Sequence, residues 1–148
     1  MKLCLTASPG GHLVQLWMLN EFYSKHDYFF VTFYSEPMKE FAKKDKFYFV
    51  TDPGRNILRF FGNIIQSLKI FIKERPDCVI STGAGVSIAM CWWAKIFGKK
   101  VVFIEDWCVV ESPSVSGRVV YPIADLFIIQ WERLQRFYPK ARFGGPLI

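Results

Sequence analysis

Two glycine-containing segments have the composition of anion-binding loops. The first, Ser8 to His12, follows a short apolar run and leads into a helix-like segment. Glycines let the backbone approach a ligand closely, and the free N–H groups at a helix start favour a phosphate. We therefore expect phosphate contacts from Ser8, Gly10 and Gly11, and an imidazole at His12 that can act as a general base. The alternative is a tight turn that Ser8 caps, with His12 solvated.

The second segment, Ser81 to Ser87, follows another apolar run. Its candidate anion-binding residues are Gly83, Ala84 and Gly85. Together with Glu105 at the end of the next apolar run, the two glycines match most of a dinucleotide-binding fingerprint, but Ile88 occupies the third glycine position. A self-contained nucleotide- or dinucleotide-binding enzyme is thus an alternative that this mismatch disfavours.

Polar residues after the fifth apolar run could complete such a site. Glu105 and Asp106 end the run, and a carboxylate there could accept sugar hydroxyls or act as a base. The alternatives are a solvated strand end or a helix cap. Further along, Ser116 and Arg118 are candidate partners of a phosphate. His12 and Glu105 are the two candidates for a catalytic base.

The elements that must position these residues follow a β-α alternation, which predicts one α/β domain over residues 1–148 with a mainly parallel, doubly wound sheet. Six strands and six helices are expected. The strands are Lys2–Thr6, Asp27–Tyr34, Lys46–Val50, Asp77–Ser81, Lys100–Glu105 and Leu126–Gln130; the helices are Gly11–Tyr23, Pro37–Lys44, Asn56–Glu74, Val86–Phe97, Ser114–Tyr121 and Glu132–Phe137. In such sheets ligands bind beyond the carboxyl ends of the strands, where the polar segments above would lie.

Composition narrows the function classes. Of the 148 residues 51% are hydrophobic and 18% aromatic, which excludes a disordered chain. The net charge of +6 favours an anionic partner. A nucleic-acid-binding module is disfavoured, because the aromatic residues lie mainly in apolar runs. The four cysteines, Cys4, Cys78, Cys91 and Cys108, form no C-x-x-C pair and predict reduced thiols, without a metal site.

The segment from Ile57 to Glu74 predicts a helix with an unusually wide apolar arc and several cations around it. Such a helix suits contact with acidic lipid headgroups. The alternative is a core helix with one wide apolar face. Trp92 and Trp93 add a second patch, since adjacent helix residues cannot both face one core. No transmembrane helix is predicted. The expected membrane contacts are Phe60, Phe61, Ile64, Phe71, Trp92 and Trp93.

Five segments carry a resemblance to a known family: SPGGH, RPDCVISTGAGVS, VVFIEDW, SPSVSGRVVYPIADLFIIQW and the terminal FGGPLI. Together they resemble the acceptor-binding, membrane-associating subunit of two-component UDP-sugar glycosyltransferases, which serve lipid-linked oligosaccharide and bacterial capsule or exopolysaccharide synthesis. The resemblance covers nearly the whole chain. A more distant similarity connects it to the amino-terminal half of the lipid-linked peptidoglycan N-acetylglucosaminyltransferase.

The resemblance implies the Rossmann-like amino-terminal half of a split GT-B glycosyltransferase, without activity alone. A polyprenyl-diphosphate-linked sugar would be the acceptor, and a separate chain would bind the UDP-sugar donor. It also implies no cofactor or metal, no nucleic acid, and a peripheral place on the cytoplasmic face of the membrane. Partner docking would involve the terminal residues Phe143, Gly144, Gly145, Pro146, Leu147 and Ile148.

Overall fold

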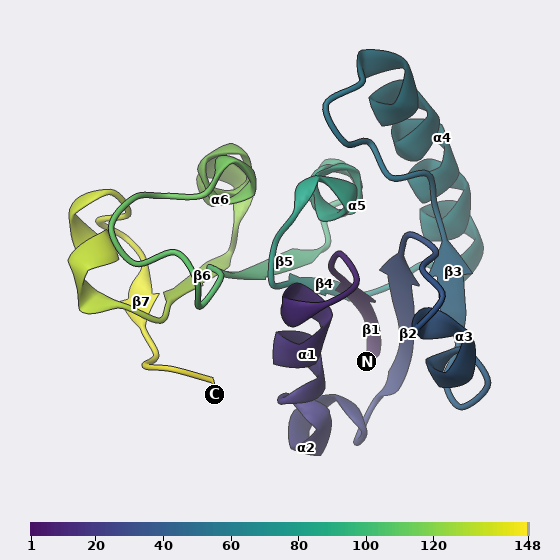
Figure 1. Ribbon diagram of the computed structural model, residues 1–148, viewed down its shortest axis with the longest axis horizontal. Coiled ribbons are helices and arrows are strands. Elements are labelled where there is room, and N and C mark those ends of the chain that lie inside the picture. Colours follow the sequence, from purple (N-terminus) through teal and green to yellow (C-terminus); the bar gives the residue numbers. More distant parts are fainter. Residues whose placement is uncertain (148) are drawn as a thin grey trace.

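A computed structural model describes residues 1–147 and contains one seven-stranded sheet (Figure 1). All six neighbouring strand pairs are parallel, and the strand order is β3-β2-β1-β4-β5-β6-β7. This confirms the predicted α/β class. The strands are β1 Lys2–Thr6, β2 Asp27–Thr32, β3 Phe47–Phe49, β4 Cys78–Ser81, β5 Lys100–Ile104, β6 Leu126–Ile129 and the unpredicted two-residue β7, Arg142–Phe143.

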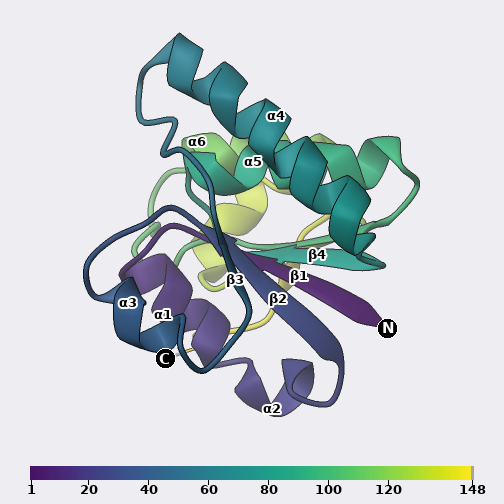
Figure 2. The ribbon, with the colours of Figure 1, turned by 90° about the vertical axis from the view of Figure 1, so that its right-hand side faces the viewer.

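The helices divide between the two faces of the sheet (Figure 2). The first face carries α1 (Gly11–Trp17), α2 (Asn20–Tyr23) and α3 (Met38–Phe41). The second carries α4 (Ile57–Glu74), α5 (Gly85–Ile96) and α6 (Val115–Val120). Two 3₁₀ turns, Tyr121–Ile123 and Glu132–Arg136, flank β6. The single helix predicted over Gly11–Tyr23 is therefore two helices.

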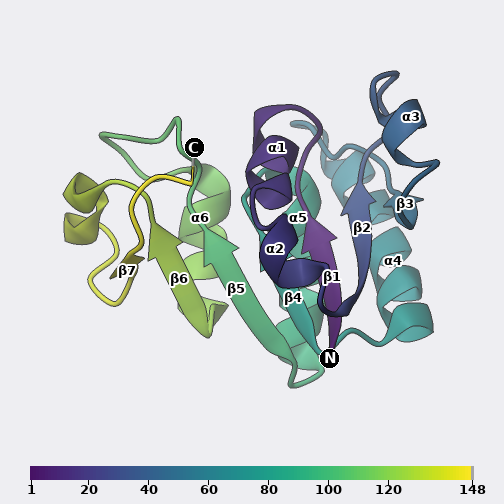
Figure 3. The same cartoon turned by 90° about the horizontal axis from the view of Figure 1, so that it is seen from below.

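The core consists of two apolar layers, one on each side of the sheet. Successive strand residues alternate between them, so that Phe29 belongs to the α5 side and Phe30 to the α1 side. Three of the four predicted free thiols are buried in these layers, and burial raises the pKa of Cys91 to about 12. The carboxyl ends of the strands all point to one edge, where the loop before α1 and the C-terminus also lie (Figure 3).

The long helix α4 buries polar residues and exposes apolar ones. Asn56 caps its N-terminus by accepting hydrogen bonds from the backbone N–H groups of Leu58 and Arg59. Asn63, Ser67 and Glu74 face inwards. The outward side carries an apolar ridge, whose members are 55–77% exposed: Ile57, Leu58, Phe61 and Ile65. Figure 1 shows the first turns of α4 projecting beyond the sheet.

One predicted membrane contact is wrong. Phe71 is only 3% exposed and stacks on Phe97, with the two ring centroids 5.2 Å apart. The helical wheel placed it among the surface residues because it lies within the wide apolar arc. Here α4 packs against α5, and Phe71 enters the core between them.

The buried Glu74 gives α4 an acid-sensitive anchor. Its carboxylate lies 2.6 Å from both Lys2 Nζ and Lys46 Nζ and accepts a hydrogen bond from Tyr48. Burial alone would raise the pKa of Glu74, but hydrogen bonds from Lys2, Lys46 and Tyr48 outweigh it and hold the pKa at about 2. This carboxylate therefore stabilises the fold above its ordinary pKa near 4.5.

We expect acid to remove that stabilisation. Between about pH 5 and pH 2 the free energy of unfolding should fall by about 3 kcal/mol through Glu74, because the unfolded chain takes up the proton first. Urea titrations across this range measure it. Glu74→Gln should be less stable at neutral pH and should lack this component of the pH dependence. Glu40→Gln, at an exposed i,i+3 ion pair with Lys43, is the matched control and should behave as wild type. Equal pH profiles for wild type and Glu74→Gln would contradict the assignment.

Candidate functional site at the carboxyl edge of the sheet

Three segments converge on Gly83, beyond the ends of β1 and β4. Gly83 has a φ of +114°, which favours glycine. A Cβ built on it would lie 3.3 Å from His12 Cε1 and 3.4 Å from Ser116 Oγ. The start of α1, the loop before α5 and the start of α6 thus meet there, and the structure brings together His12, Gly83 and Ser116 as the sequence predicted.

Two reciprocal hydrogen bonds join the two glycine loops. Thr82 Oγ1 donates to the backbone oxygen of His12 at 2.6 Å, and His12 Nδ1 lies 2.9 Å from the backbone oxygen of Thr82. A carbonyl oxygen only accepts, so Nδ1 carries the hydrogen. The other ring nitrogen, Nε2, is then the atom that can accept a proton. Sequence reasoning missed Thr82, which lies between the strand and the glycines.

Asp106, and not Glu105, is the carboxylate beside His12. Its Oδ2 lies 3.7 Å from His12 Nε2. Its Oδ1 accepts a 2.6 Å hydrogen bond from Gln15 Nε2 on α1. The imidazole is about one quarter exposed, with 27% of its side-chain surface accessible. The carbonyl at Nδ1 thus fixes the orientation of the ring, and the free lone pair of the imidazole is the one at Nε2, beside Asp106.

Glu105 lies beneath the site with no exposed surface. Oε1 accepts hydrogen bonds from Ser114 Oγ at 2.6 Å and from the backbone N–H of Asp106, and Oε2 accepts from Tyr138 OH at 2.6 Å and from the backbone N–H of Ser114. Burial and the bond to Glu105 raise the pKa of Tyr138, which keeps its hydroxyl protonated as the donor. These four hydrogen bonds fix the position of segment 106–114. They also occupy the Glu105 carboxylate, so it is not free to bind a ribose hydroxyl, as a dinucleotide-binding enzyme would require.

The start of α5 is a strained anion-binding candidate. Its N-cap, Ala84, has a φ of +72°, which costs a non-glycine residue about 1–3 kcal/mol. The Ser87 hydroxyl lies 3.1 Å from the Gly83 oxygen and 2.8 Å from the Ala84 oxygen, and it stabilises this conformation. Gly10, with a φ of +95°, occupies the N-cap of α1, where no side chain caps the helix. The alternative role of Ser8 as a cap is therefore wrong.

A buried amide relay joins this site to the end of the chain. Gln15 Oε1 accepts hydrogen bonds from Gln130 Nε2 at 2.6 Å and from the backbone N–H of Trp107 at 3.1 Å. Gln130 Oε1 accepts one from the backbone N–H of Leu147 at 2.8 Å. Gln15 and Gln130 are each at most 2% exposed. Their only sequence signal was a glutamine within each of two apolar runs, LVQLW and FIIQW.

The terminal segment lies at the same edge of the sheet. The backbone N–H of Gly144 bonds the Ile129 oxygen at 3.0 Å, and Phe143 is 54% exposed. Phe143 and Pro146 line an open cavity of about 530 Å³ with Trp131. Of the predicted docking residues, Ile148 lies outside the described part of the chain.

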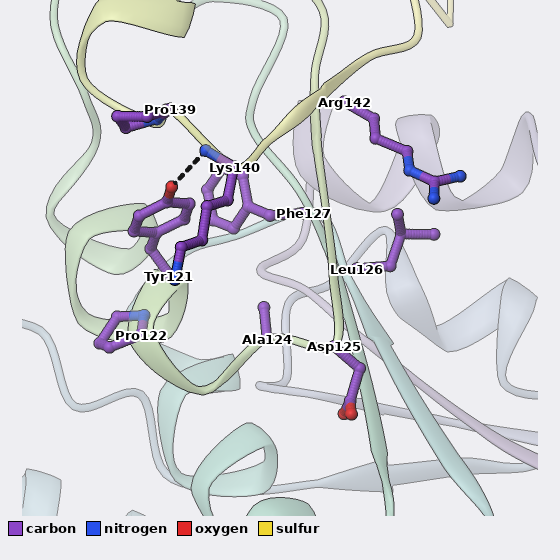
Figure 4. Close-up of a pocket in the computed structure, with 9 residues that line it drawn as sticks. All are labelled: Tyr121, Pro122, Ala124, Asp125, Leu126, Phe127, Pro139, Lys140 and Arg142. Atoms are coloured by element: carbon purple, nitrogen blue, oxygen red, sulfur yellow. Dashed lines mark hydrogen bonds between the residues drawn. The ribbon is translucent and has the colours of Figure 1, made fainter.

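A second cavity, of about 710 Å³, lies at the opposite edge of the sheet (Figure 4). Asp125 and Leu126, at the start of β6, line it together with Tyr121, Lys140 and Arg142. The backbone N–H of Lys140 donates to the Tyr121 hydroxyl at 2.8 Å. This cavity contains none of the predicted site residues. Over residues 1–147, no group of three His, Cys, Asp or Glu side chains is arranged to hold a metal ion.

Comparison with known families identifies the chain. A family model described as "Oligosaccharide biosynthesis protein Alg14 like" matches residues 53–147. The chain belongs to the Alg14 family. This confirms the resemblance predicted from the sequence. The Alg14 match includes α4, the Gly83 loop, Glu105 and α6; the His12 loop precedes it.

Curated Alg14 relatives match over part of their length. The human "UDP-N-acetylglucosamine transferase subunit ALG14" is 34% identical over 88 residues, which are 55% of this chain and 41% of the relative. The Mus musculus protein of the same name is 34% identical over 99 residues, 63% of this chain and 46% of the relative. The aligned region thus spans less than half of these curated relatives.

Solved structures support the fold. The MurG crystal structure from Acinetobacter baumannii superposes with a TM-score of 0.74 at 12% identity, over 89% of this Alg14-family chain and 42% of MurG. The UDP-GlcNAc 2-epimerase of Methanocaldococcus jannaschii, in complex with UDP-GlcNAc and UDP, gives a TM-score of 0.76 at 17% identity, over 95% of this chain and 43% of the epimerase. The Rossmann-like, GT-B-type domain is thereby confirmed.

Proposed function

We propose that this chain is the acceptor-side subunit of a two-component glycosyltransferase. It binds a polyprenyl-diphosphate-linked sugar on the cytoplasmic face of a membrane and recruits a separate chain that carries the UDP-sugar. The observation that carries the proposal is the convergence of His12, Gly83 and Ser116 at the sheet edge from which the apolar ridge of α4 projects. Curated relatives named as transferase subunits support the division between two chains.

The acceptor diphosphate would lie against the glycine loops. Gly10, Gly11 and Gly85 have no Cβ to block close approach, and backbone N–H groups in the first turn of α5 favour negative charge. Arg118 is exposed on α6, but residues two apart on a helix point in different directions, so the structure does not bring Arg118 together with Ser116.

His12 would act as the base in an inverting transfer. The acceptor hydroxyl attacks the anomeric carbon of the donor sugar, the bond between that carbon and the UDP oxygen breaks, and UDP leaves. In this step Nε2 takes up the hydroxyl proton, and the Asp106 carboxylate stabilises the imidazolium. Glu105, the other predicted base, would serve as a positioning residue, because its four hydrogen bonds hold the segment that bears Asp106. No metal or organic cofactor enters this proposal.

The partner chain would dock beside the terminal segment. Phe143 and Pro146 present apolar surface there. On the α1 side, no helix of the described chain covers β5 and β6, where Val102, Leu126 and Ile128 are only half-buried (Figure 3). Apolar surface of this kind is typical of protein–protein contacts.

Reconstitution of the two chains tests whether acceptor binding and donor binding reside on separate chains. The purified chain should transfer no sugar from UDP-N-acetylglucosamine to a polyprenyl-diphosphate acceptor until the donor-binding chain is added, because the donor site lies on that chain. The rate of product formation is measured with each chain alone and with both together. Robust transfer by this chain alone would overturn the proposal.

Membrane contact would run through the ridge of α4. None of the helices in residues 1–147 is both long and apolar enough to cross a bilayer. The ridge residues lie at least 55% exposed, and Arg55 and Arg59 accompany them at the start of the helix. The predicted contacts Phe60, Ile64 and Trp93 are half-buried, whereas Phe61 and Trp92 are exposed. An exposed apolar strip with flanking cations binds the headgroup region of anionic membranes.

We expect Leu58→Ser combined with Phe61→Ser to release the chain from anionic vesicles, with at least a tenfold loss of partitioning. Both side chains are more than half exposed, so the free energy of unfolding should change by less than about 1 kcal/mol. Co-sedimentation measures the first and urea titration the second. Met18→Ser combined with Phe22→Ser, exposed on the α1 side, is the matched control and should still sediment. Undiminished binding by the ridge variant would rule the ridge out.

A further inference from the structure

An apolar groove runs along the outer surface of α5, between α4 and α6. Its volume is about 330 Å³, at the small end of ligand pockets. Phe60 and Ile64 of α4 form one wall and Val119 of α6 the other. Trp93 Nε1 donates a 3.0 Å hydrogen bond to the Ile64 oxygen, which ties α4 to α5 beside the groove. The floor consists of Ile88, Ala89, Trp92, Trp93 and Ile96, and the exposed lining contains no polar surface.

The groove starts within one helical turn of the candidate acceptor site. Ile88, Trp92 and Ile96 follow one another at four-residue spacing, so they line one face of α5 over roughly 12 Å. Ile88 lies within one turn of Gly85, where the helix starts. On α6, Val119 is three residues beyond Ser116, and neighbours at this spacing share a face. Both helices that line the groove therefore start at the cluster around Gly83.

We propose that this groove binds the first isoprene units of a polyprenyl diphosphate, with the diphosphate at the glycine loops. The inference rests on the proposed function and adds a defined site for the apolar part of the acceptor. An anionic head joined directly to a single apolar chain matches a polar cluster that lies within one helical turn of a narrow apolar groove. A phospholipid carries two acyl chains on a glycerol, which this path does not match.

The groove is too small to enclose a protein helix, which could only lie across its opening. A 12 Å length of helix with a diameter of about 10 Å fills on the order of 900 Å³, nearly three times the volume available. A single hydrocarbon chain needs no such width. Ile57 lies three residues before Phe60, and Phe61 lies three residues before Ile64, so the ridge of α4 borders the wall of the groove and would contact the bilayer beside it.

Binding of farnesyl diphosphate tests the inference without a membrane or a partner. The full chain is titrated by calorimetry at probe concentrations below micelle formation, with tryptophan fluorescence reporting on Trp92 and Trp93. Farnesyl diphosphate should bind at least tenfold more tightly than inorganic pyrophosphate. Ile96→Asn and Val119→Asn should each weaken its binding about tenfold and leave pyrophosphate binding unchanged. Both side chains are exposed, at 63% and 37%, so the variants should fold.

Two controls give the test its specificity. Ile72→Asn changes an isoleucine of α4 that is 52% exposed and lies outside the groove, and it should bind farnesyl diphosphate as wild type does. Dodecyl phosphate, with an unbranched chain, should bind at least tenfold more weakly than farnesyl diphosphate. Equal binding of the two amphiphiles, or groove variants with wild-type affinity, would overturn the inference. Competition between the partner chain and farnesyl diphosphate would assign the groove to the partner instead.

The outcomes separate this inference from the proposed function. The reconstituted pair could transfer sugar while the groove variants bind farnesyl diphosphate as tightly as wild type. This result would overturn the groove inference and leave the proposed function intact. Absence of transfer by the pair, with groove-dependent binding retained, would overturn the transferase assignment.

Discussion

Gly117→Ala should destabilise the fold by about 3 kcal/mol or more. A Cβ at this position would enter the contact distance of three polar atoms, which are Glu105 Oε2, Tyr138 OH and Ser114 Oγ. These atoms form the hydrogen-bonded cluster around the buried carboxylate, and none of them belongs to a flexible exposed side chain. To admit the methyl group, the bonds to Glu105 must break or α6 must shift, and overpacking at such sites is costly.

Urea unfolding monitored by circular dichroism measures the loss. Gly62→Ala is the matched control, because Gly62 is also helical but has no atom within 4 Å of its built Cβ. That variant should gain about 0.5–1 kcal/mol from helix propensity. If Gly117→Ala were as stable as wild type, the close packing around Glu105 would be disproved.

Loss of the His12 imidazole should slow sugar transfer by the reconstituted pair about 10²- to 10⁴-fold, the range typical of a removed general base. His12→Ala should reduce the turnover number more than the apparent affinity for the acceptor. Asp106→Asn should lower the turnover number less than His12→Ala does, because it removes the charge partner but keeps the imidazole. Steady-state rates over a range of acceptor concentrations separate the turnover number from the apparent affinity.

The second histidine supplies the control. His26 follows α2 and packs edge-on against Phe22, with the ring centroids 5.3 Å apart, and it contacts none of the site residues described above. His26→Ala should transfer sugar at the wild-type rate. Because His12 also forms hydrogen bonds with Thr82, the free energy of unfolding of His12→Ala must be measured together with its transfer rate. A folded His12→Ala variant with an undiminished turnover number would remove His12 from the chemistry.

The sheet was largely predictable because its strands are short apolar runs between turn-forming residues. Strand β7 was not predicted, because a strand of two exposed residues is too short to show a periodic hydrophobic pattern. The glycine loops were also predictable, because they follow β1 and β4 directly. Which of the two acidic residues faces His12 was not: consecutive residues at a strand end point to opposite sides, and the sequence alone does not say which side holds the ligand.

The orientation of α4 and the amide relay needed tertiary information. A helical wheel finds the apolar arc but does not show which part of it faces the core and which part faces solvent. Asn63 instead turns inwards because its side-chain nitrogen bonds the Thr51 oxygen, and Glu74 does so because Lys2 and Lys46 meet it there. Gln15 and Gln130 are 115 residues apart in sequence, so no local pattern relates them.

The outward-facing ridge of α4 also bears on how such a sequence can vary. Core positions stay apolar because a polar replacement unfolds the protein. Leu58 and Phe61 face no such constraint, since folding alone would tolerate serine or lysine at either position. Under selection for folding only, these positions would drift towards polar residues. Sequences of this family that keep them apolar would therefore be preserving a surface, and those in which they have become polar would mark lineages that no longer use it.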